Sequence, residues 1–257
     1  MTVLIPFLHG NRKVRQTIRR GMPRRGVRVA TCRSPERLRM LFDRELIDAV
    51  VIDVRAAWAT PALDLIPLYP RIPFFGLARF RPDDGVLLGV CRERGVRDVF
   101  VEGVDGLAAG ELIASRTASS VRREALGGAP RMLRLIDDLQ VRAWEEVLNR
   151  AGTPTTTSEI AKALKQTREH LSREFGAGGA PNLKRVIDLA RVAWAADLLG
   201  NPGYRVASVA SILGYASPSH LAECGRRVAG ATPAELGRMG PRGVLDRFRR
   251  GRMRSRI

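Results

Sequence analysis

The chain has 257 residues, 45% of them hydrophobic, and its 44 Lys and Arg against 26 Asp and Glu give a formal net charge of +18. This length predicts one to two domains, and the apolar fraction is enough to bury cores, which excludes a disordered basic tail. The basic surplus indicates a polyanionic partner, either nucleic acid or an anionic membrane surface. Arginine far outnumbers lysine, which favours nucleic acid because guanidinium groups recognise phosphate and guanine, although a GC-rich genome would give the same bias.

Neither a membrane span nor a metal site is expected. No apolar run reaches the roughly 18–20 residues that a transmembrane helix needs, and residues 1–7 lack the basic start of a signal peptide. The cysteines and histidines are Cys32, Cys91, Cys224, His9, His170 and His220. Their odd cysteine count and wide spacing argue against disulfides and zinc. We therefore expect a cytoplasmic protein without a metal or cofactor.

Five apolar runs in the first 125 residues alternate with amphipathic segments. The runs are 3–7, 27–31, 49–54, 72–77 and 99–101. Ser34 before Pro35 predicts the start of a helix after the second run, and the β-branched third run is typical of a buried parallel strand. The pattern predicts an α/β flavodoxin-like domain, a doubly wound sheet over residues 1–126.

Three of these segments, 48–55, 72–78 and 95–102, resemble the third, fourth and fifth strands of a response-regulator receiver domain. The resemblance makes Asp53 the counterpart of the phospho-accepting aspartate. A receiver also needs an acidic pair after strand one, a hydroxyl after strand four and a lysine after strand five, and this chain has residues 6–9 (Pro-Phe-Leu-His), Ala78 and Glu102 there. Mg²⁺ prefers several oxygen ligands, and phosphoryl transfer depends on electrostatic stabilisation. A site that lacks the acidic pair, the hydroxyl and the lysine therefore lacks most of what phosphorylation requires.

The domain is therefore interpreted as a degenerate pseudo-receiver. Asp53 is either a residue that caps a loop at the end of its strand or a vestigial phospho-acceptor and ligand site at the edge of the sheet.

A different pattern follows the boundary predicted at 127–130. Residues 132–149 have the apolar spacing of a helix. Residues 157–164 predict the next helix, with Ser158 as its cap, and 165–167 a short turn. Thr167 then caps a helix over 168–175, in which Leu171 and Phe175 face inward. This is the pattern of a helix-turn-helix unit.

The pattern repeats further along the chain. A long helix is predicted over 183–199 and a break over 200–203. A helix over 206–215 then ends at a glycine turn, and Ser217 before Pro218 starts the next helix. A final short helix begins within 230–236. Two helix-turn-helix units joined by one long helix are therefore predicted.

This arrangement resembles the DNA-binding domain of AraC/XylS family regulators over residues 130–240. The similarity lies in residues 158–161, 170–175, 190–199, 209–215, 219–221 and 232–236. It implies that the two units lie at the ends of a linker helix and enter successive major grooves, about 34 Å apart. The sequence departs from the family at three positions. In the first unit, Lys165 stands where the family usually has glycine. In the second unit, Gly225 stands where an aromatic residue is usual and Glu223 where a basic or neutral contact residue is common, so the first unit is the better equipped to read bases.

The expected DNA contacts lie on the outer faces of the two recognition helices. They are Thr167, Arg168, Glu169, Ser172, Arg173, Ser217, Ser219, His220, Glu223, Arg226 and Arg227. Residues 241–257 form a basic tail, whose segment 242–257 has seven arginines and one acid. With too few apolar residues to fold by itself, it is expected to bind phosphates or only to aid solubility.

The predicted function is sequence-specific regulation of transcription, with double-stranded DNA as partner and RNA polymerase or another regulator as a further candidate. The alternative is an architectural or scaffold protein that binds DNA electrostatically and docks a partner through the pseudo-receiver. An enzyme is not expected, because no nucleophile–base pair, phosphate-binding glycine loop or metal cluster is evident in the sequence. The oligomeric state stays open.

Overall fold

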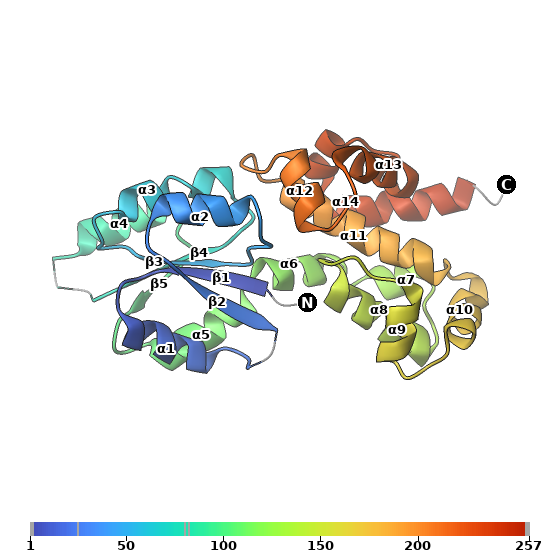
Figure 1. The fold of residues 1–257 in the computed structure, drawn as a ribbon, viewed down its shortest axis with the longest axis horizontal. Helices are drawn as coiled ribbons and strands as arrows, with labels where there is room; N and C mark the ends of the chain where they lie inside the picture. Colours follow the sequence, from blue (N-terminus) through green and yellow to red (C-terminus); the bar gives the residue numbers. More distant parts are fainter. Residues whose placement is uncertain (1–2, 25, 80, 82, 255–257) are drawn as a thin grey trace. The chain divides into compact units, whose positions relative to one another are not determined.

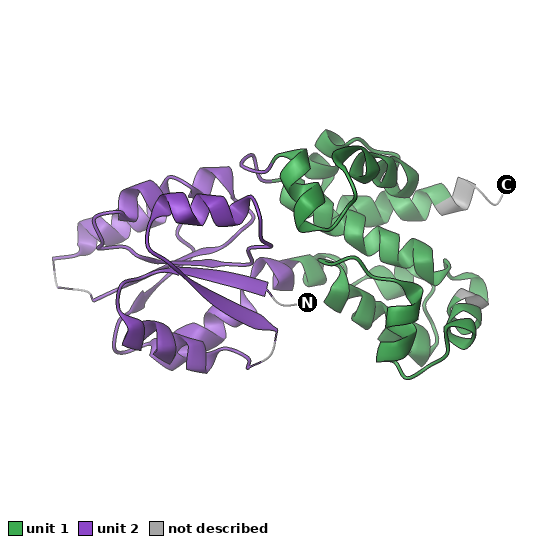
Figure 2. Cartoon of the chain, viewed as in Figure 1, with its two compact units in different colours: residues 1, 122–200, 205–257 green, residues 2–121, 201–204 purple. Residues whose placement is uncertain are grey.

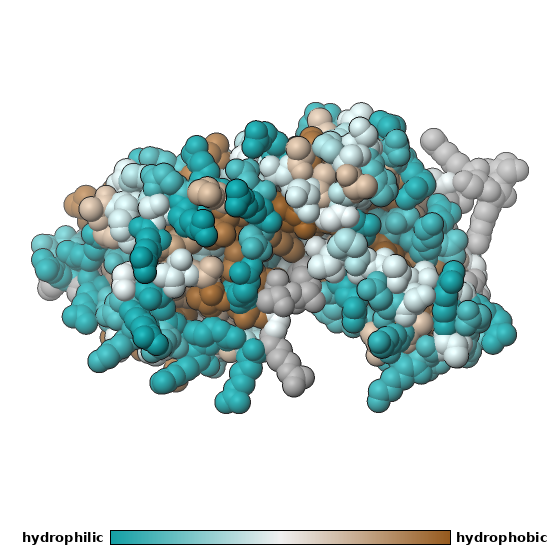
Figure 3. Space-filling view, in the orientation of Figure 1, coloured by the Kyte–Doolittle hydropathy of each residue, from teal (hydrophilic) through white to brown (hydrophobic). Residues whose placement is uncertain are grey.

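A computed structural model describes every residue except 1–2, 25, 80, 82 and 255–257. The chain forms two compact units, one of residues 2–121 with 201–204 and one of residues 122–200 with 205–257 (Figure 2). Hydrophilic side chains cover most of the visible face of each unit (Figure 3). Among the described residues, no helix combines the length and the apolar character needed to cross a bilayer.

The N-terminal unit is built on a five-stranded parallel sheet in the order β2-β1-β3-β4-β5 (Figure 1). Its strands are β1 (Val3–Leu8), β2 (Val27–Cys32), β3 (Val50–Asp53), β4 (Phe74–Ala78) and β5 (Asp98–Val101). This strand order is that of flavodoxin-like folds. The predicted α/β class is confirmed, and each of the five apolar runs contains or overlaps a strand.

Helices cover both faces of the sheet (Figure 1). One face carries α1 (Arg12–Gly21) and α5 (Gly106–Ser115), and the other carries α2 (Pro35–Phe42), α3 (Ala59–Leu63), the 3₁₀ helix η1 (Ile66–Leu68) and α4 (Gly85–Glu93). Ser34 caps α2 as predicted, its hydroxyl accepting from the Arg37 amide. Glycines let α1 and α5 approach closely, since a Cβ on Gly110 would lie 2.2 Å from the carbonyl oxygen of Ile18. The core under these two helices contains Phe7, Phe75 and Ile113.

The C-terminal unit is helical. After α6 (Ala118–Ala125), which contains the division between the units, come α7 (Ala129–Leu133), α8 (Asp138–Arg150), α9 (Thr157–Ala163), α10 (Arg168–Gly176), the 3₁₀ helix η2 (Ala177–Gly179), α11 (Leu183–Leu199), α12 (Val206–Ile212), α13 (Pro218–Ala229) and α14 (Pro233–Arg254). Twelve of the 17 residues of α11 are buried, so this helix is the core of the unit rather than a surface linker.

A buried ion pair joins α6 to α11 within this unit. The Arg122 Nε lies 2.5 Å from the Asp197 Oδ2, and the guanidinium also lies 5.8 Å from the ring centroid of Trp194. Because the Arg122 side chain is fully buried, loss of either partner would leave an uncompensated charge in the core, at a cost of about 3–5 kcal/mol.

Two predicted helix boundaries are wrong in detail. The helix expected over 132–149 is interrupted, because Arg134 is in the left-handed region with φ of 58°. Asp137 then caps α8, and Gln140 completes the capping box. The cap of α9 is Thr156 instead of Ser158, and Glu159 closes a capping box by accepting from the Thr156 amide at 2.7 Å. Both capping boxes satisfy amide groups that the first helical turn leaves free.

The basic tail predicted from residue 241 is part of a helix. Helix α14 kinks at Gly240 and then continues through Pro241 to Arg254. Val244, Leu245 and Phe248 are buried, and their spacing forms an apolar stripe along α14, which packs along α11. The few apolar residues of this segment are enough to hold it, because their helical spacing places them on one face. Residues 255–257 lie outside the described chain.

The turns of the two helix-turn-helix units predict opposite effects of glycine and alanine substitutions on stability. Lys165 has φ of 55° and Gly214 has φ of 64°, so both turns need a left-handed residue. Lys165→Gly should raise the free energy of unfolding by up to about 1 kcal/mol, because a Cβ in this conformation costs roughly 1–2 kcal/mol and the greater freedom of unfolded glycine offsets part of the gain. Gly214→Ala should lower it by more than about 1 kcal/mol, since its Cβ would also lie 2.3 Å from the Pro154 Cγ.

Urea denaturation of the full chain measures both effects. Lys165→Ala is the matched control, because it removes the same charge and keeps the Cβ. Equal stabilisation by alanine and glycine would assign the gain to lost charge and contradict the backbone argument.

Candidate nucleic-acid interface

The first helix-turn-helix unit consists of α9 and α10. Thr167 caps α10 as predicted, since its hydroxyl oxygen accepts from the His170 amide at 3.2 Å. Leu171 and Phe175 are fully buried, so one face of α10 is fixed against the core. The opposite face is therefore presented to solvent in one orientation.

That outer face carries Arg168, Glu169, Ser172 and Arg173, all of which are exposed. Arg173 makes an exposed ion pair with Glu174, with 3.6 Å between Nε and Oε1. Exposed pairs of this kind contribute little and are easily exchanged for other partners. The face thus offers two guanidinium groups and a hydroxyl, which are donors suited to base edges and phosphates.

The end of α10 is held by a residue that was not among the predicted site residues. The side-chain amide of Gln140, from α8, donates to the carbonyl oxygens of Glu174 at 3.1 Å and Phe175 at 3.0 Å. Its carbonyl oxygen accepts from the amides of Ile136 and Asp137. One buried side chain therefore satisfies the start of α8 and the end of the recognition helix together. The only signal in the sequence was a glutamine three residues after Asp137, the spacing of a capping box.

The second unit consists of α12 and α13, with Gly214 in the turn between them. Ser217 caps α13 as predicted, accepting from the His220 amide at 3.1 Å. Arg191, from α11, donates to the carbonyl oxygens of Leu213 at 3.0 Å and Gly214 at 3.2 Å. The same guanidinium lies 4.2 Å from the ring centroid of Tyr215. This arginine ties the turn to the long helix, a role that the sequence analysis did not assign.

The outer face of α13 is less open than that of α10. Ser219, Glu223 and Arg226 are exposed, whereas Ser217 and His220 are half-buried. The His220 ring makes an edge-to-face contact with Tyr215, at 5.6 Å between centroids. Arg227 is exposed but pairs with Asp188, at 3.0 Å between Nη2 and Oδ2. Of the two arginines expected here, only Arg226 projects without an acidic partner among the described residues.

Gly225 does not leave a void in α13. A Cβ at this position would lie 2.8 Å from the Leu236 Cδ1 and 3.0 Å from the Ala231 carbonyl oxygen. The neighbouring Leu236 already fills the space that a larger side chain at residue 225 would need. The glycine at residue 225 therefore lets the start of α14 approach α13 more closely than a larger side chain would allow.

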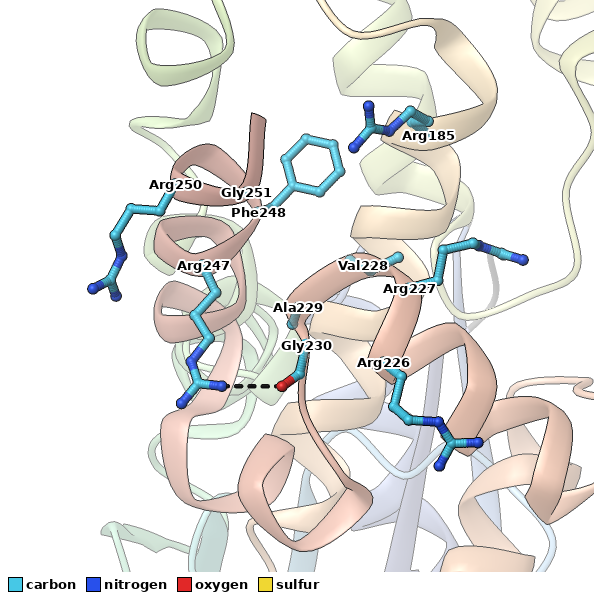
Figure 4. Close-up of a pocket in the computed structure, with 10 residues that line it drawn as sticks. All are labelled: Arg185, Arg226, Arg227, Val228, Ala229, Gly230, Arg247, Phe248, Arg250 and Gly251. Carbon is cyan, nitrogen blue, oxygen red and sulfur yellow. Dashed lines mark hydrogen bonds between the residues drawn. The ribbon is translucent and has the colours of Figure 1, made fainter. Parts of the chain in front are cut away.

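A basic pocket of about 580 Å³ lies beside the C-terminal end of α13, between this helix end, α11 and α14 (Figure 4). Its five arginines come from three helices and are Arg185, Arg226, Arg227, Arg247 and Arg250. None of the described residues that line it is acidic. Arg247 donates to the carbonyl oxygen of Gly230 at 3.2 Å, and Arg185 lies 5.2 Å from the ring centroid of Phe248. Arg227 is already paired with Asp188, and the guanidinium groups point in different directions (Figure 4). The pocket is therefore a basic surface rather than a closed site for one phosphate.

The edge of the sheet in the N-terminal unit brings His9, Asp53 and Glu102 together. The His9 Nδ1 accepts from the Asn11 amide at 3.2 Å, so the proton of the neutral ring is on Nε2. That Nε2 lies 3.9 Å from the Asp53 Oδ2 and 3.7 Å from the Glu102 Oε2. The buried imidazole therefore lies close to the carboxylates of both Asp53 and Glu102.

Other contacts give Asp53 a structural role. Its Oδ1 accepts from the Arg55 amide at 3.1 Å, which caps the loop after β3. Ala78 is buried and offers no hydroxyl, and Glu102 pairs with Arg79 at 3.4 Å. Within the described part of the chain, no group of three or more His, Cys, Asp or Glu is placed to hold a metal ion.

The thiols give no sign of nucleophilic chemistry. All three cysteines are free and buried. Burial raises the pKa of Cys32 to about 11 and raises the pKa values of Cys91 and Cys224 as well. Because the thiolate is the nucleophile, these thiols are unreactive at neutral pH.

Comparison with known proteins supports the helix-turn-helix reading of the C-terminal unit. Residues 160–239 match the family model described as a helix-turn-helix domain, which is of the AraC type. The match covers α10 to α13 with the end of α9 and the start of α14. It supports a DNA-binding transcription regulator. The comparison with curated proteins gave no match.

Asp53 should not be phosphorylated to a stable product. The positions that would bind Mg²⁺ and balance the phosphoryl charge hold His9, Ala78 and Glu102, so transition-state stabilisation is missing. After incubation with Mg²⁺ and acetyl phosphate, intact-mass spectrometry should show an unchanged mass. A receiver domain with the full acidic pair, hydroxyl and lysine serves as the positive control. A stoichiometric phosphate adduct that Asp53→Asn removes would contradict the pseudo-receiver interpretation.

Proposed function

We propose that this protein is a sequence-specific DNA-binding transcription regulator whose two helix-turn-helix units enter successive major grooves. The observation that carries the proposal is the pair of capped helices, α10 and α13, whose buried faces pack in one domain that matches an AraC-type model. Residues 130–240 would form this DNA-binding domain, and residues 1–126 a pseudo-receiver that receives a signal or contacts RNA polymerase or another regulator.

The length of α11 supports the spacing of the two units. Its 17 residues make a rod of about 25 Å at 1.5 Å per residue. Gln140 and Arg191 each fix one unit by side-chain hydrogen bonds, so the recognition helices extend from a rigid scaffold. One turn of DNA is about 34 Å, a span that a rod of this length with a helix-turn-helix unit near each end can match.

The two units are proposed to contribute differently. Arg168, Glu169, Ser172 and Arg173 in the first unit are exposed and extend from a fixed helix, which suits base reading. In the second unit, Arg227 is paired with Asp188 and His220 packs on Tyr215, so Ser219 and Arg226 remain as the most accessible donors. Thr167 and Ser217 serve first as helix caps. We infer that the second unit and the basic pocket mainly position the protein on phosphates.

The architectural alternative has one observation in its favour, the basic pocket at the end of α13. A protein held on DNA by such contacts alone would bind all sequences with similar affinity. Specific regulators bind their sites roughly 10³–10⁷ times more tightly than random DNA. This ratio therefore separates the two functions.

Arg168→Ala should weaken binding to the cognate site more than binding to random DNA. A bidentate contact from arginine to guanine discriminates by about 1–3 kcal/mol. The cognate site is first obtained by in vitro selection with the full chain, and affinities are then measured by fluorescence anisotropy. Arg142→Ala is the matched control, because Arg142 is exposed on α8 and, among the described residues, forms an ion pair with Asp138 alone. Equal losses of affinity for the cognate and the random duplex would show that Arg168 contacts only phosphate.

The basic pocket should set part of the salt dependence. Replacing Arg247 and Arg250 with glutamine should make the slope of log affinity against log salt shallower by about 1–2 units, since each phosphate contact contributes about 0.9. The preference for the cognate site should survive. Deleting the segment is a poorer test, because Val244 and Phe248 are buried in the core of the unit.

The matched control replaces Arg242 and Arg249, which are exposed on the same helix outside the pocket. Both double variants lose the same charge. An equal change of slope in the two would show that net charge, and not the pocket, determines the salt dependence.

A further inference from the structure

A second pocket lies in the N-terminal unit. It has a volume of about 590 Å³ and opens at the carboxyl ends of β4 and β5, beside the first turns of α1 and α5. In doubly wound sheets, ligands bind outside the carboxyl ends of the strands. The volume is in the range of pockets that hold small molecules, about 300–1,000 Å³.

Most of the wall is apolar. Val14 and Ile18 come from α1, Leu77 comes from β4, Val104 lies in the loop before α5, and Leu107 lies in the first turn of α5. Val104 is 78% exposed and Leu107 is 56% exposed, so two neighbouring apolar side chains face water at the edge of the cavity. A bound apolar group would remove this surface from water, which is favourable.

The rim is polar and mostly basic. Lys13 has no acidic partner among the described residues that line the pocket, whereas Glu102 is held by Arg79 at 3.4 Å and by Asn11 at 3.3 Å. The one acid at the rim is thus already paired. The ammonium group of Lys13 is left as the free charge.

The start of α5 adds donors to the same rim. The Asp105 carboxylate accepts from the Val101 amide at 2.7 Å, and no side chain caps α5. The first amide groups of α5 therefore lack a side-chain acceptor, and residues 106–108 line the pocket. Free amides at a helix start favour an anion.

We propose that this pocket binds an amphipathic anion, with an acidic head between Lys13 and the start of α5 and an apolar body over Val14, Val104 and Leu107. The apolar wall excludes a purely polar ion, and the basic rim excludes a neutral hydrocarbon. A regulator whose Asp53 site lacks phosphorylation chemistry would then receive its signal as a small molecule. Binding of the anion does not depend on the DNA-binding proposal, whereas its role as a signal rests on the proposed function.

The test uses the full-length protein and 8-anilinonaphthalene-1-sulfonate, which joins an aromatic body to one sulfonate. Fluorescence titration should show saturable binding, and decanoate, a carboxylate with an apolar tail, should displace the dye. Lys13→Gln should weaken binding about tenfold, because a hydrogen bond to a charged group is lost. Arg20→Gln, an exposed charge on α1 outside the pocket, should change it less than twofold.

A blocking variant tests the cavity itself. Ala108→Trp, on the exposed first turn of α5, should abolish saturable binding, whereas Val86→Trp, on the exposed first turn of α4, should not. Circular dichroism and DNA binding should be unchanged in all four variants, so a folding defect or a failure of the DNA proposal is recognised separately.

Equal effects of Lys13→Gln and Arg20→Gln would overturn the proposal by showing that the dye follows net charge. Retained binding in Ala108→Trp would overturn it as well. So would a dimer, seen by sedimentation velocity, that Ala108→Trp disrupts and decanoate does not affect, because the apolar rim would then be an interface between copies of the chain.

Discussion

The burial of α11 is the constraint on which the C-terminal unit depends. A helix that is apolar on nearly every side cannot face water, so other helices must cover it. Helix α14 packs along its length, and α8, α9, α10, α12 and α13 also pack against it. A close approach at Gly237, whose Cβ would meet the Leu199 carbonyl oxygen at 2.5 Å, fixes the start of α14. The positions of both recognition helices follow from this packing.

The large arginine content divides between structure and interface. Arg122 is buried in an ion pair, Arg191 holds the turn before α13, and Arg227 is paired with Asp188. These guanidinium groups already bind carboxylate or carbonyl oxygens of the protein, and a phosphate would have to replace those partners. Arg168 and Arg226 extend from surfaces with no such commitment. Net charge alone therefore overstates the surface that the protein can offer to DNA.

The sequence by itself determined the class of each domain and most helix starts. Alternating apolar runs predicted the parallel sheet, since strands buried on both faces must be apolar. Ser34, Thr167 and Ser217 were identifiable as caps because capping depends on residues only two or three positions away. The long helix over 183–199 was equally readable, because its apolar residues recur at helical spacing between two breaks in the chain. The absence of an acidic pair, a hydroxyl and a lysine around Asp53 was also visible from residue types alone.

Only the tertiary structure decided which side chains are free and which are engaged. Gln140 reaches the end of α10 from another helix, and His9, directly after β1, approaches Asp53. Both contacts join residues more than 30 positions apart in the sequence. The predicted tail is helical because Val244 and Phe248 are buried where α14 packs along α11. This packing cannot be predicted from the composition of the tail. The cavity at the carboxyl ends of β4 and β5 likewise joins residues from distant segments. Local propensity and capping are encoded within a few residues, whereas burial, pairing and cavities depend on which distant segments the fold brings into contact.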